Sequence, residues 1–298
     1  MARIGFIVVG NMGGPMAQNL LKAGHEVRAF DLAAEAVDRA VAAGATAAAS
    51  VQEAAVDADV VVTMLPAGKH VGQVYLGDDG IIAAAAANTL FIDSSTIDVA
   101  TAREVIAAAE KGGMEMIDAP VSGGVGGAET GTLTFMCGGA DGAFDRARPY
   151  LEQMGKTIVH AGPAGNGQAA KICNNMILAI SMIGVGEAFV LAEKLGVDHQ
   201  TLFDICSTAS AQCWALTSYC PVPGPVPASP ANRDYQAGFT AANMLKDLRL
   251  SQEAAEGFGA KTELGADATR LFAAYAEENG MAAKDFSGII NMIRENSS

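Results

Sequence analysis

Basic residues are scarce in this chain of 298 residues. Lys and Arg together number 19 against 33 Asp and Glu, which gives a net charge of -14 at pH 7. Proteins that hold nucleic acid or an anionic membrane by charge need a basic surface, so neither partner is expected. The acidic total does not exclude a small anionic substrate, because a local cluster of Lys and Asn is enough to hold one.

Cysteine and histidine are also few, and they are scattered along the chain. The cysteines are Cys137, Cys173, Cys206, Cys213 and Cys220, and the histidines are His25, His70, His160 and His199. No C-x-x-C pair occurs, so we expect reduced thiols and neither a disulfide framework nor a metal site. The N-terminus lacks a basic segment followed by a cleavage site, so the expected location is the cytoplasm.

Hydrophobic residues make up 50% of the chain, and 298 residues favour two domains. In the first half, β-rich runs alternate with helical stretches. These runs are 4–9, 26–31, 59–64, 89–93 and 115–117. The alternation predicts an α/β fold with a doubly wound, mostly parallel sheet of the Rossmann type over residues 1–163.

The strand signal disappears after Gly196. Helical patches follow at 200–207, 241–256, 264–279 and 286–294, interrupted by a proline-rich loop at 221–230. We therefore expect an all-α domain for substrate binding and dimerisation over residues 164–298, including a long linking helix at 167–195.

A glycine-rich loop follows the first predicted strand. It contains Gly10, Asn11, Met12 and Gly13, and a helix and a second strand ending in Asp31 come next. This order predicts a dinucleotide site, in which loop N–H groups and the helix N-terminus hold a pyrophosphate. The carboxylate of Asp31 would accept hydrogen bonds from a ribose and would repel a 2′-phosphate, so NAD is expected rather than NADP.

Val8 departs from the pattern G-x-G-x-x-G, which has glycine at that position. In the simplest interpretation Val8 extends the apolar strand. A β-branched residue fits without strain only if its φ is negative, so we expect weaker cofactor binding but not its loss.

Three further loops are predicted at the carboxyl ends of strands, where ligands bind in such sheets. They contain Leu65 and Pro66, then 94–96 including Thr96, then 122–124. Each alone is compatible with an ordinary turn, but three at one edge favour a site.

The segment from Gly162 to Gly196 opens with Gly162, Gly165 and Gly167, and a long apolar helix follows. Lys171 and Asn175 share one face of that helix, one turn apart. The alternative to a site is a lysine that extends to the surface beside an interhelical amide hydrogen bond. Charged residues within the helix argue against a membrane span, and its apolar surface favours a subunit interface.

These segments together resemble the β-hydroxyacid dehydrogenase family over essentially the whole chain. Residues 118–124 (DAPVSGG) resemble the family's substrate-binding signature, and residues 162–175 match its catalytic signature G-x-x-G-x-G-x-x-x-K-x-x-x-N. The segment Lys246-Asp247-Leu248 resembles its C-terminal site segment. Val8 is the departure.

The resemblance implies a role for each site residue. Lys171 would be the catalytic acid/base, which a lysine can be if burial and a neighbouring cation lower its pKa toward the working pH. The substrate would be held by Ser122, Gly123, Gly124, Asn175, Trp214, Phe239 and Asp247. Leu65, Pro66, Thr96 and Lys246 would line the NAD site. Without the resemblance, Trp214 and Phe239 would be interpreted as core or interface anchors and Lys246-Asp247 as a solvated helix face.

The implied activity is NAD-dependent oxidation of a small β-hydroxy acid without a metal. By the same resemblance, the region around Trp214 and the proline-rich loop favour 3-hydroxyisobutyrate as the substrate, with methylmalonate semialdehyde as the product in valine catabolism. Reduction of tartronate semialdehyde, or action on another β-hydroxy acid, is the alternative. A non-catalytic NAD-binding scaffold is a different class of alternative. A homodimer or homotetramer is expected.

Overall fold

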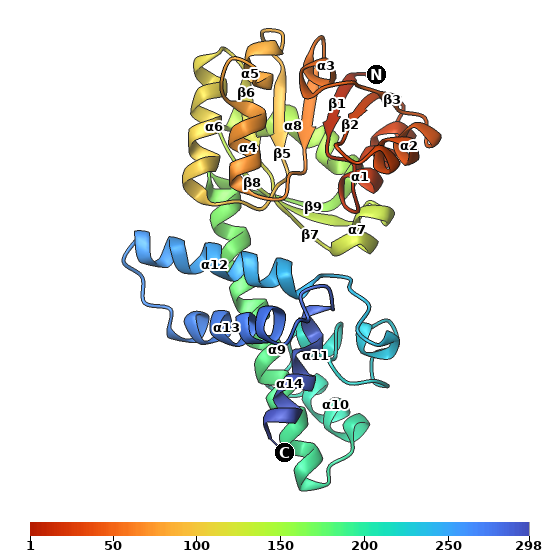
Figure 1. The fold of residues 1–298 in the computed structure, drawn as a ribbon, viewed down its shortest axis with the longest axis vertical. Coiled ribbons are helices and arrows are strands. Elements are labelled where there is room, and N and C mark those ends of the chain that lie inside the picture. The colour runs from red at the N-terminus through yellow and green to blue at the C-terminus, as the bar shows by residue number, and fades with distance from the viewer. Residues whose placement is uncertain (298) are drawn as a thin grey trace. The chain divides into compact units, whose positions relative to one another are not determined.

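The computed structural model describes residues 1–297, which form two compact units. The first unit is Met1–Lys171 and the second begins at Ile172. Helix α9 (Asn166–Leu195) supplies the last residues of the first unit and the first residues of the second, as the ribbon in Figure 1 shows.

A nine-stranded sheet forms the centre of the first unit, in the order β3-β2-β1-β4-β5-β6-β8-β7, with β9 paired to β8. Its strands are β1 (Arg3–Ile7), β2 (Glu26–Phe30), β3 (Thr46–Ala47), β4 (Val60–Thr63), β5 (Leu90–Asp93), β6 (Glu115–Asp118), β7 (Val121–Ser122), β8 (Leu133–Gly138) and β9 (Gly155–Gly162). Strands β1 to β6 pair in parallel, whereas β8 runs antiparallel to β6 and β7. The predicted doubly wound, mostly parallel sheet is confirmed. The order reverses between β1 and β4, which is where such sheets bind ligands.

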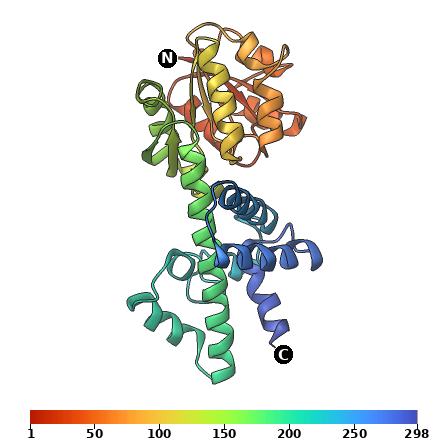
Figure 2. The same cartoon turned by 90° about the vertical axis from the view of Figure 1, so that its left-hand side faces the viewer.

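Helices cover both faces of the sheet because successive strand side chains point to opposite faces. On β1, Ile4 and Phe6 join one core cluster and Ile7 joins the other. The first cluster includes α1 (Gly13–Lys22), α2 (Ala34–Ala42), α7 (Gly124–Thr130) and α8 (Asp141–Met154). The second includes α3 (Val51–Ala55), α4 (Gly68–Tyr75), α5 (Ile81–Ala84) and α6 (Val99–Lys111). Helices α4 and α6 lie side by side in both views (Figures 1 and 2).

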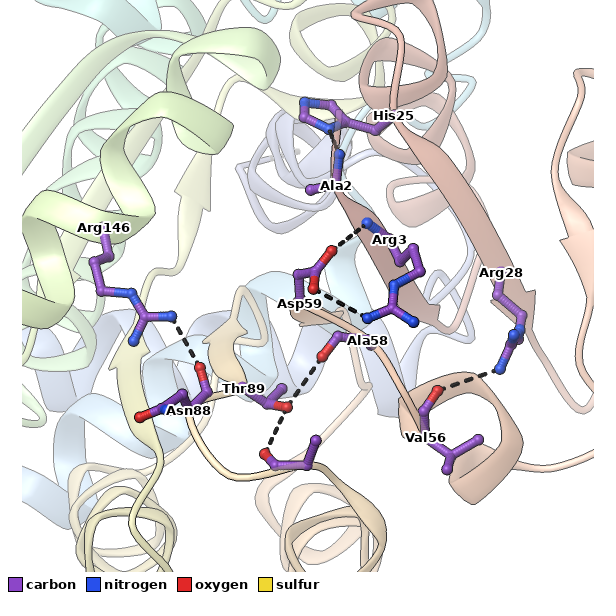
Figure 3. A network of polar contacts seen from close by, with 11 residues as sticks. Ala2, Arg3, His25, Arg28, Val56, Ala58, Asp59, Asn88, Thr89 and Arg146 are labelled. Atoms are coloured by element: carbon purple, nitrogen blue, oxygen red, sulfur yellow. Dashed lines mark hydrogen bonds and ion pairs between the residues drawn. The ribbon is translucent and has the colours of Figure 1, made fainter.

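Polar contacts connect the strands at the edge of the sheet where the parallel strands begin (Figure 3). The backbone N–H of Arg3 donates to Asp59 at 2.8 Å, and the Arg3 guanidinium lies 3.3 Å from the same carboxylate. The backbone hydrogen bond from Arg3 is the main reason that the pKa of Asp59 is lowered. Nearby, the Thr89 hydroxyl donates to the Ala58 carbonyl at 3.0 Å. These contacts hold the starts of β1, β4 and β5 together.

The second unit is helical over its described residues, apart from one isolated bridge between Thr240 and Asp285. After α9 it contains α10 (His199–Thr208), α11 (Trp214–Thr217), α12 (Ala241–Gly257), α13 (Glu263–Ala273) and α14 (Ile289–Asn296). It also contains the short 3-10 helices η1 (Pro230–Arg233) and η3 (Phe286–Gly288) and the π-helix η2 (Ala274–Glu278). The predicted stop of the long helix is confirmed, because Gly196 takes φ +77°.

Helix α9 is, within residues 1–297, long and apolar enough to cross a membrane by length and composition alone. A core helix of a globular protein meets the same criterion. In its second-unit part, Ala179 and Met182 pack in a core cluster with α12 and α13.

Candidate active site

The glycine loop joins β1 to α1. A Cβ added at Gly13 would lie 2.0 Å from the Val8 carbonyl oxygen, so only glycine lets the helix begin so close to the strand. A Cβ added at Gly10 would meet nothing within 4 Å, so the space beside Gly10 is open to a ligand. The first turn of α1 carries no acidic side chain and no side-chain cap. Open space and uncapped N–H groups fit the pyrophosphate of a dinucleotide.

Val8 does not extend the strand, contrary to the simplest interpretation of the sequence. Strand β1 ends at Ile7, and Val8 takes φ +71°. Its N–H still donates to the Phe30 carbonyl at 2.7 Å. Val8 thus has the left-handed backbone conformation that usually requires glycine. A β-branched residue is strained in that conformation. The condition for an unstrained valine, a negative φ, is not met.

Asp31 follows the last residue of β2, as the sequence pattern requires. One of its carboxylate oxygens accepts from the Val9 N–H at 3.0 Å and the other accepts from the Ala33 N–H at 2.9 Å. These bonds fix the carboxylate beside the glycine loop and leave lone pairs for a ribose. The residues of the loop and Asp31 therefore fit NAD.

The loops after β4 and β5 are tied together by a buried polar network. Thr63 and Ser95 both donate hydroxyl hydrogen bonds to Asp93, and Ser95 accepts from the Leu65 N–H at 2.8 Å. Burial raises the pKa of Asp93 despite these bonds. Leu65 places its side chain in the core, so its part in a site would be through its backbone. Pro66 is exposed and Thr96 is half-buried.

Ser122 ends β7, where it pairs with Thr134 of β8. Gly123 takes φ +135° and Gly124 takes φ +61°, and α7 begins at Gly124. Side chains rarely adopt such backbone angles, so the two glycines are required by the turn itself. Ser122 and Gly124 are half-buried and Gly123 is exposed, which leaves their polar groups accessible.

The three glycines before Lys171 have separate physical reasons. Gly162 takes φ +110° and Gly165 takes φ +82°, whereas a Cβ at Gly167 would lie 2.3 Å from the Met136 carbonyl oxygen. These glycines allow the first residues of α9 to pack closely against the ends of β6 and β8. Lys171 then lies about one turn into the helix, with only 7% of its surface exposed.

Asp118, the last residue of β6, holds the start of α9. One oxygen accepts from the Gly165 N–H and the other from the Gln168 N–H, both at 2.8 Å. Burial raises the pKa of Asp118 to about 6, and the charge of Asp93 adds to this, while the two backbone bonds oppose it. Asp118 and Gln168 lie within the two segments that resemble the family's signatures, but the sequence assigns no role to them or to Asp93. The pairing Asp118–Gln168 joins positions 50 residues apart, so only the folded sheet reveals it.

In the second unit, Asn175 lies buried on α9 and Asp247 lies buried on α12. The Asn175 amide donates to Asp247 at 2.5 Å and accepts from the Asn174 amide at 2.9 Å. Lys246 lies 3.2 Å from the same carboxylate. Asp247 therefore orients Asn175 and balances the Lys246 charge.

The aromatic residues Trp214 and Phe239 lie in the same unit. Trp214 is 51% exposed, so it is not a core residue of this chain, and its ring stacks on Tyr219 at 4.8 Å. Asp285, to which no sequence motif points, accepts from the Tyr219 hydroxyl at 2.9 Å and from the Phe239 N–H at 3.1 Å. One buried carboxylate thus holds the segments that carry both rings.

The part of the chain that the structure describes contains no group of three or more His, Cys, Asp or Glu arranged to hold a metal ion.

Comparison with known proteins agrees with this architecture. Residues 3–162 match the family model described as the NAD binding domain of 6-phosphogluconate dehydrogenase. Residues 165–293 match the model described as NAD-binding of NADP-dependent 3-hydroxyisobutyrate dehydrogenase. The fold and these matches define an NAD-binding oxidoreductase.

The relatives narrow the class further. The chain is 52% identical over 294 residues to the probable 3-hydroxyisobutyrate dehydrogenase of Mycobacterium tuberculosis, covering 99% of this chain and 98% of the relative. It is 50% identical to the NAD-dependent L-serine dehydrogenase of Pseudomonas aeruginosa, with 96% of each covered. The solved structure of the M. tuberculosis 3-hydroxyisobutyrate dehydrogenase with L-serine superimposes with a TM-score of 0.94 at 52% identity, covering 99% of both chains. The chain belongs to the 3-hydroxyisobutyrate dehydrogenase family.

Proposed function

We propose that this chain oxidises the terminal hydroxyl of 3-hydroxyisobutyrate to the aldehyde of methylmalonate semialdehyde, with NAD as the oxidant and Lys171 as the general acid/base. The observation that carries the proposal is the position of Lys171. It is a charged side chain with 7% exposure, in the first turns of a helix that begins at the carboxyl edge of an NAD-binding sheet. A lysine is rarely buried without a reason, and function is the usual one.

Oxidation of the alcohol removes a hydride from the carbon and a proton from the hydroxyl oxygen. NAD, when bound, accepts the hydride from the alcohol carbon. The hydroxyl proton must leave at the same time, and the uncharged amine of Lys171 would accept it on Nζ. In the reverse direction the ammonium would return the proton to the aldehyde oxygen.

The other proposed residues bind and orient. Ser122 and the backbone N–H groups of Gly123 and Gly124 offer donors to the substrate carboxylate. Asn175, whose amide is fixed by Asp247, would position the substrate hydroxyl without adding charge. Trp214 and Phe239 would form an apolar wall. Gly10, Asn11, Met12, Gly13, Asp31, Leu65, Pro66, Thr96 and Lys246 are the proposed NAD contacts.

The test is Lys171→Ala, with Lys156→Ala as a matched control. Lys156 is an exposed lysine on β9 of the same unit. Loss of a general acid/base should lower kcat about 10²- to 10⁴-fold while the NADH dissociation constant stays nearly unchanged. Near-normal turnover by Lys171→Ala would reject its role, and the control should behave as wild type.

A second candidate is the oxidation of L-serine. It is favoured by the relative named as an L-serine dehydrogenase and by the similar structure solved with L-serine. L-Serine and 3-hydroxyisobutyrate share the hydroxymethyl and carboxylate groups and differ at C2, which carries ammonium or methyl. Initial rates with both, and with tartronate semialdehyde plus NADH, rank the candidates by kcat/KM. If all three are inactive while NADH binds, the non-catalytic scaffold is the better interpretation.

We also propose a cytoplasmic homodimer or homotetramer that binds neither nucleic acid nor membrane. Ile177, Leu191 and Leu195 are exposed on α9, and their spacing puts them on one face of the helix. An apolar stripe of this kind is typical of a subunit interface. Light scattering after size exclusion measures the subunit number, and a monomer at micromolar concentration would contradict the proposal.

A further inference from the structure

We propose that Asp118 and Gln168 are positioning residues for the reaction. Together they attach the first turn of α9 to the ends of β5 and β6. This attachment fixes the backbone from which Lys171 projects. This inference rests on the proposed role of Lys171 as the acid/base. Neither residue is expected to touch the substrate, because Gln168 is fully buried and Asp118 is 1% exposed.

Asp118 satisfies two N–H groups at the start of α9, one just before the helix and one in its first turn. The first N–H groups of a helix have no partner within the helix and carry partial positive charge. The two Asp118 oxygens accept from Gly165 and Gln168, and the carboxylate comes from β6, about 50 residues earlier in the chain. The cap therefore joins the helix to the sheet, which a local Ser or Asp cap would not do.

Gln168 makes a second, independent connection to the sheet. Its side-chain oxygen accepts from the Ile97 N–H at 3.1 Å, and its side-chain nitrogen donates to the Ser95 carbonyl at 2.8 Å. Both partners lie in the segment that follows β5. The neutral amide of Gln168 can make both bonds, whereas a carboxylate cannot donate and an ammonium cannot accept.

Close packing removes the remaining freedom. A Cβ added at Gly138 would lie 2.5 Å from Asp118 Oδ1 and 2.7 Å from the Gly167 nitrogen. The start of α9 and Gly138 are therefore packed too closely for a side chain to fit between them, and the hydrogen bonds oppose movement of the helix away from the sheet. Lys171 lies three residues beyond Gln168, about 4.5 Å along the helix axis, so a shift of this turn moves its Cα almost equally.

The test compares Gln168→Met, Gln168→Glu and Asp118→Asn with the control Thr89→Val. Methionine has nearly the volume of glutamine and makes neither bond. Thr89 is equally buried, and its hydroxyl bonds to Ala58 and Ala86 at the opposite edge of the sheet. Misplacement of a reacting group by about 1 Å can cost about 100-fold, so we expect each site variant to lower kcat at least tenfold. The KM for the hydroxy acid should change less than about threefold. The control variant Thr89→Val should have a lower Tm than the wild type but an unchanged kcat.

A double-mutant cycle separates positioning from general damage. Lys171→Ala is assayed with methylamine, which supplies a mobile base that α9 does not position. Adding Gln168→Met to Lys171→Ala should then change the rescued turnover less than about twofold. An equal loss in both backgrounds, or a normal kcat in Gln168→Met alone, would overturn the inference. Normal turnover by Lys171→Ala would instead overturn the proposed function.

Hydrogen exchange of the wild-type chain gives a measurement that needs no variant. The N–H groups of Gly165 and Gln168 should exchange as slowly as those of the central strands, because Asp118 holds both. Exchange as fast as in an exposed loop would show that the turn is not fixed and would overturn the inference.

Discussion

Replacement of Val8 tests the unusual backbone of the glycine loop directly. Val8 has φ +71°, and its side chain is partly buried against the core cluster around Ile7. Glycine at position 8 would relieve strain but lose the side-chain contacts and gain freedom in the unfolded state. Alanine would lose most of the contacts but keep the Cβ that causes the strain.

The comparison of Gly with Ala therefore isolates the effect of φ. A Cβ in the left-handed region costs about 1–2 kcal/mol. The greater freedom of unfolded glycine costs about 0.5–1 kcal/mol. At position 8 the glycine variant should thus be more stable than the alanine variant by about 0.5–1 kcal/mol.

The control is the same pair of substitutions at Val56. That residue is also partly exposed, but its φ is −62°. There the alanine variant should be more stable by about 0.5–1 kcal/mol. Urea unfolding followed by far-UV circular dichroism measures both pairs. If alanine is the more stable at both positions, residue 8 does not occupy the left-handed region in solution and the account of the loop is wrong.

Three other predictions concern the cofactor and the buried acid. Val8→Gly should also tighten NADH binding, measured by fluorescence titration; unchanged or weaker affinity would count against the expected penalty of valine. Asp31→Ala should relax the preference for NAD over NADP in kcat/KM, and unaltered discrimination would show that another residue sets it. Asp118 has a folded pKa of about 6 against 3.8 unfolded, so the folded state binds the proton more tightly and this contribution to stability falls as pH rises between these values. The whole fall is about 3 kcal/mol at about 1.4 kcal/mol per pKa unit, and about 2 kcal/mol of it lies between pH 4.5 and 6.5. Urea unfolding at pH 4.5, 5.5 and 6.5 should show it in wild type and not in Asp118→Asn, and a parallel pH dependence in both would contradict it.

The parallel sheet was predictable because its central strands β4 and β5 are short, mostly apolar runs that are buried on both faces. Helix α8 was not predicted. Pro149 lies inside it, and proline within a helix removes a backbone hydrogen bond. Tertiary packing of Phe144 and Leu151 overrides that cost. Helix α7 was missed because three of its seven residues are glycines, and it is held by packing of Ala128 and by the Asn19 hydrogen bond to that residue's carbonyl.

The candidate site was predictable where its residues are close in sequence. Lys171 and Asn175 are one helical turn apart, and the glycines before them mark the loop that precedes the helix. The roles of Asp118 and Gln168 depend on a contact across 50 residues, which a local pattern does not contain. For Val8, the sequence indicates that a valine is unstrained only at a negative φ. The positive φ that Val8 takes follows from how β1 meets α1 in the fold.

The polar edge at Arg3 and Asp59 also has a practical consequence. Residue 1 is exposed at the side of the sheet where β1 begins, and β1 rises about 17 Å before it reaches the glycine loop. A fluorophore or an affinity handle joined to residue 1 would therefore lie at the edge of the sheet opposite the glycine loop. Tethering the enzyme to a sensor surface through that end should leave dinucleotide exchange unhindered.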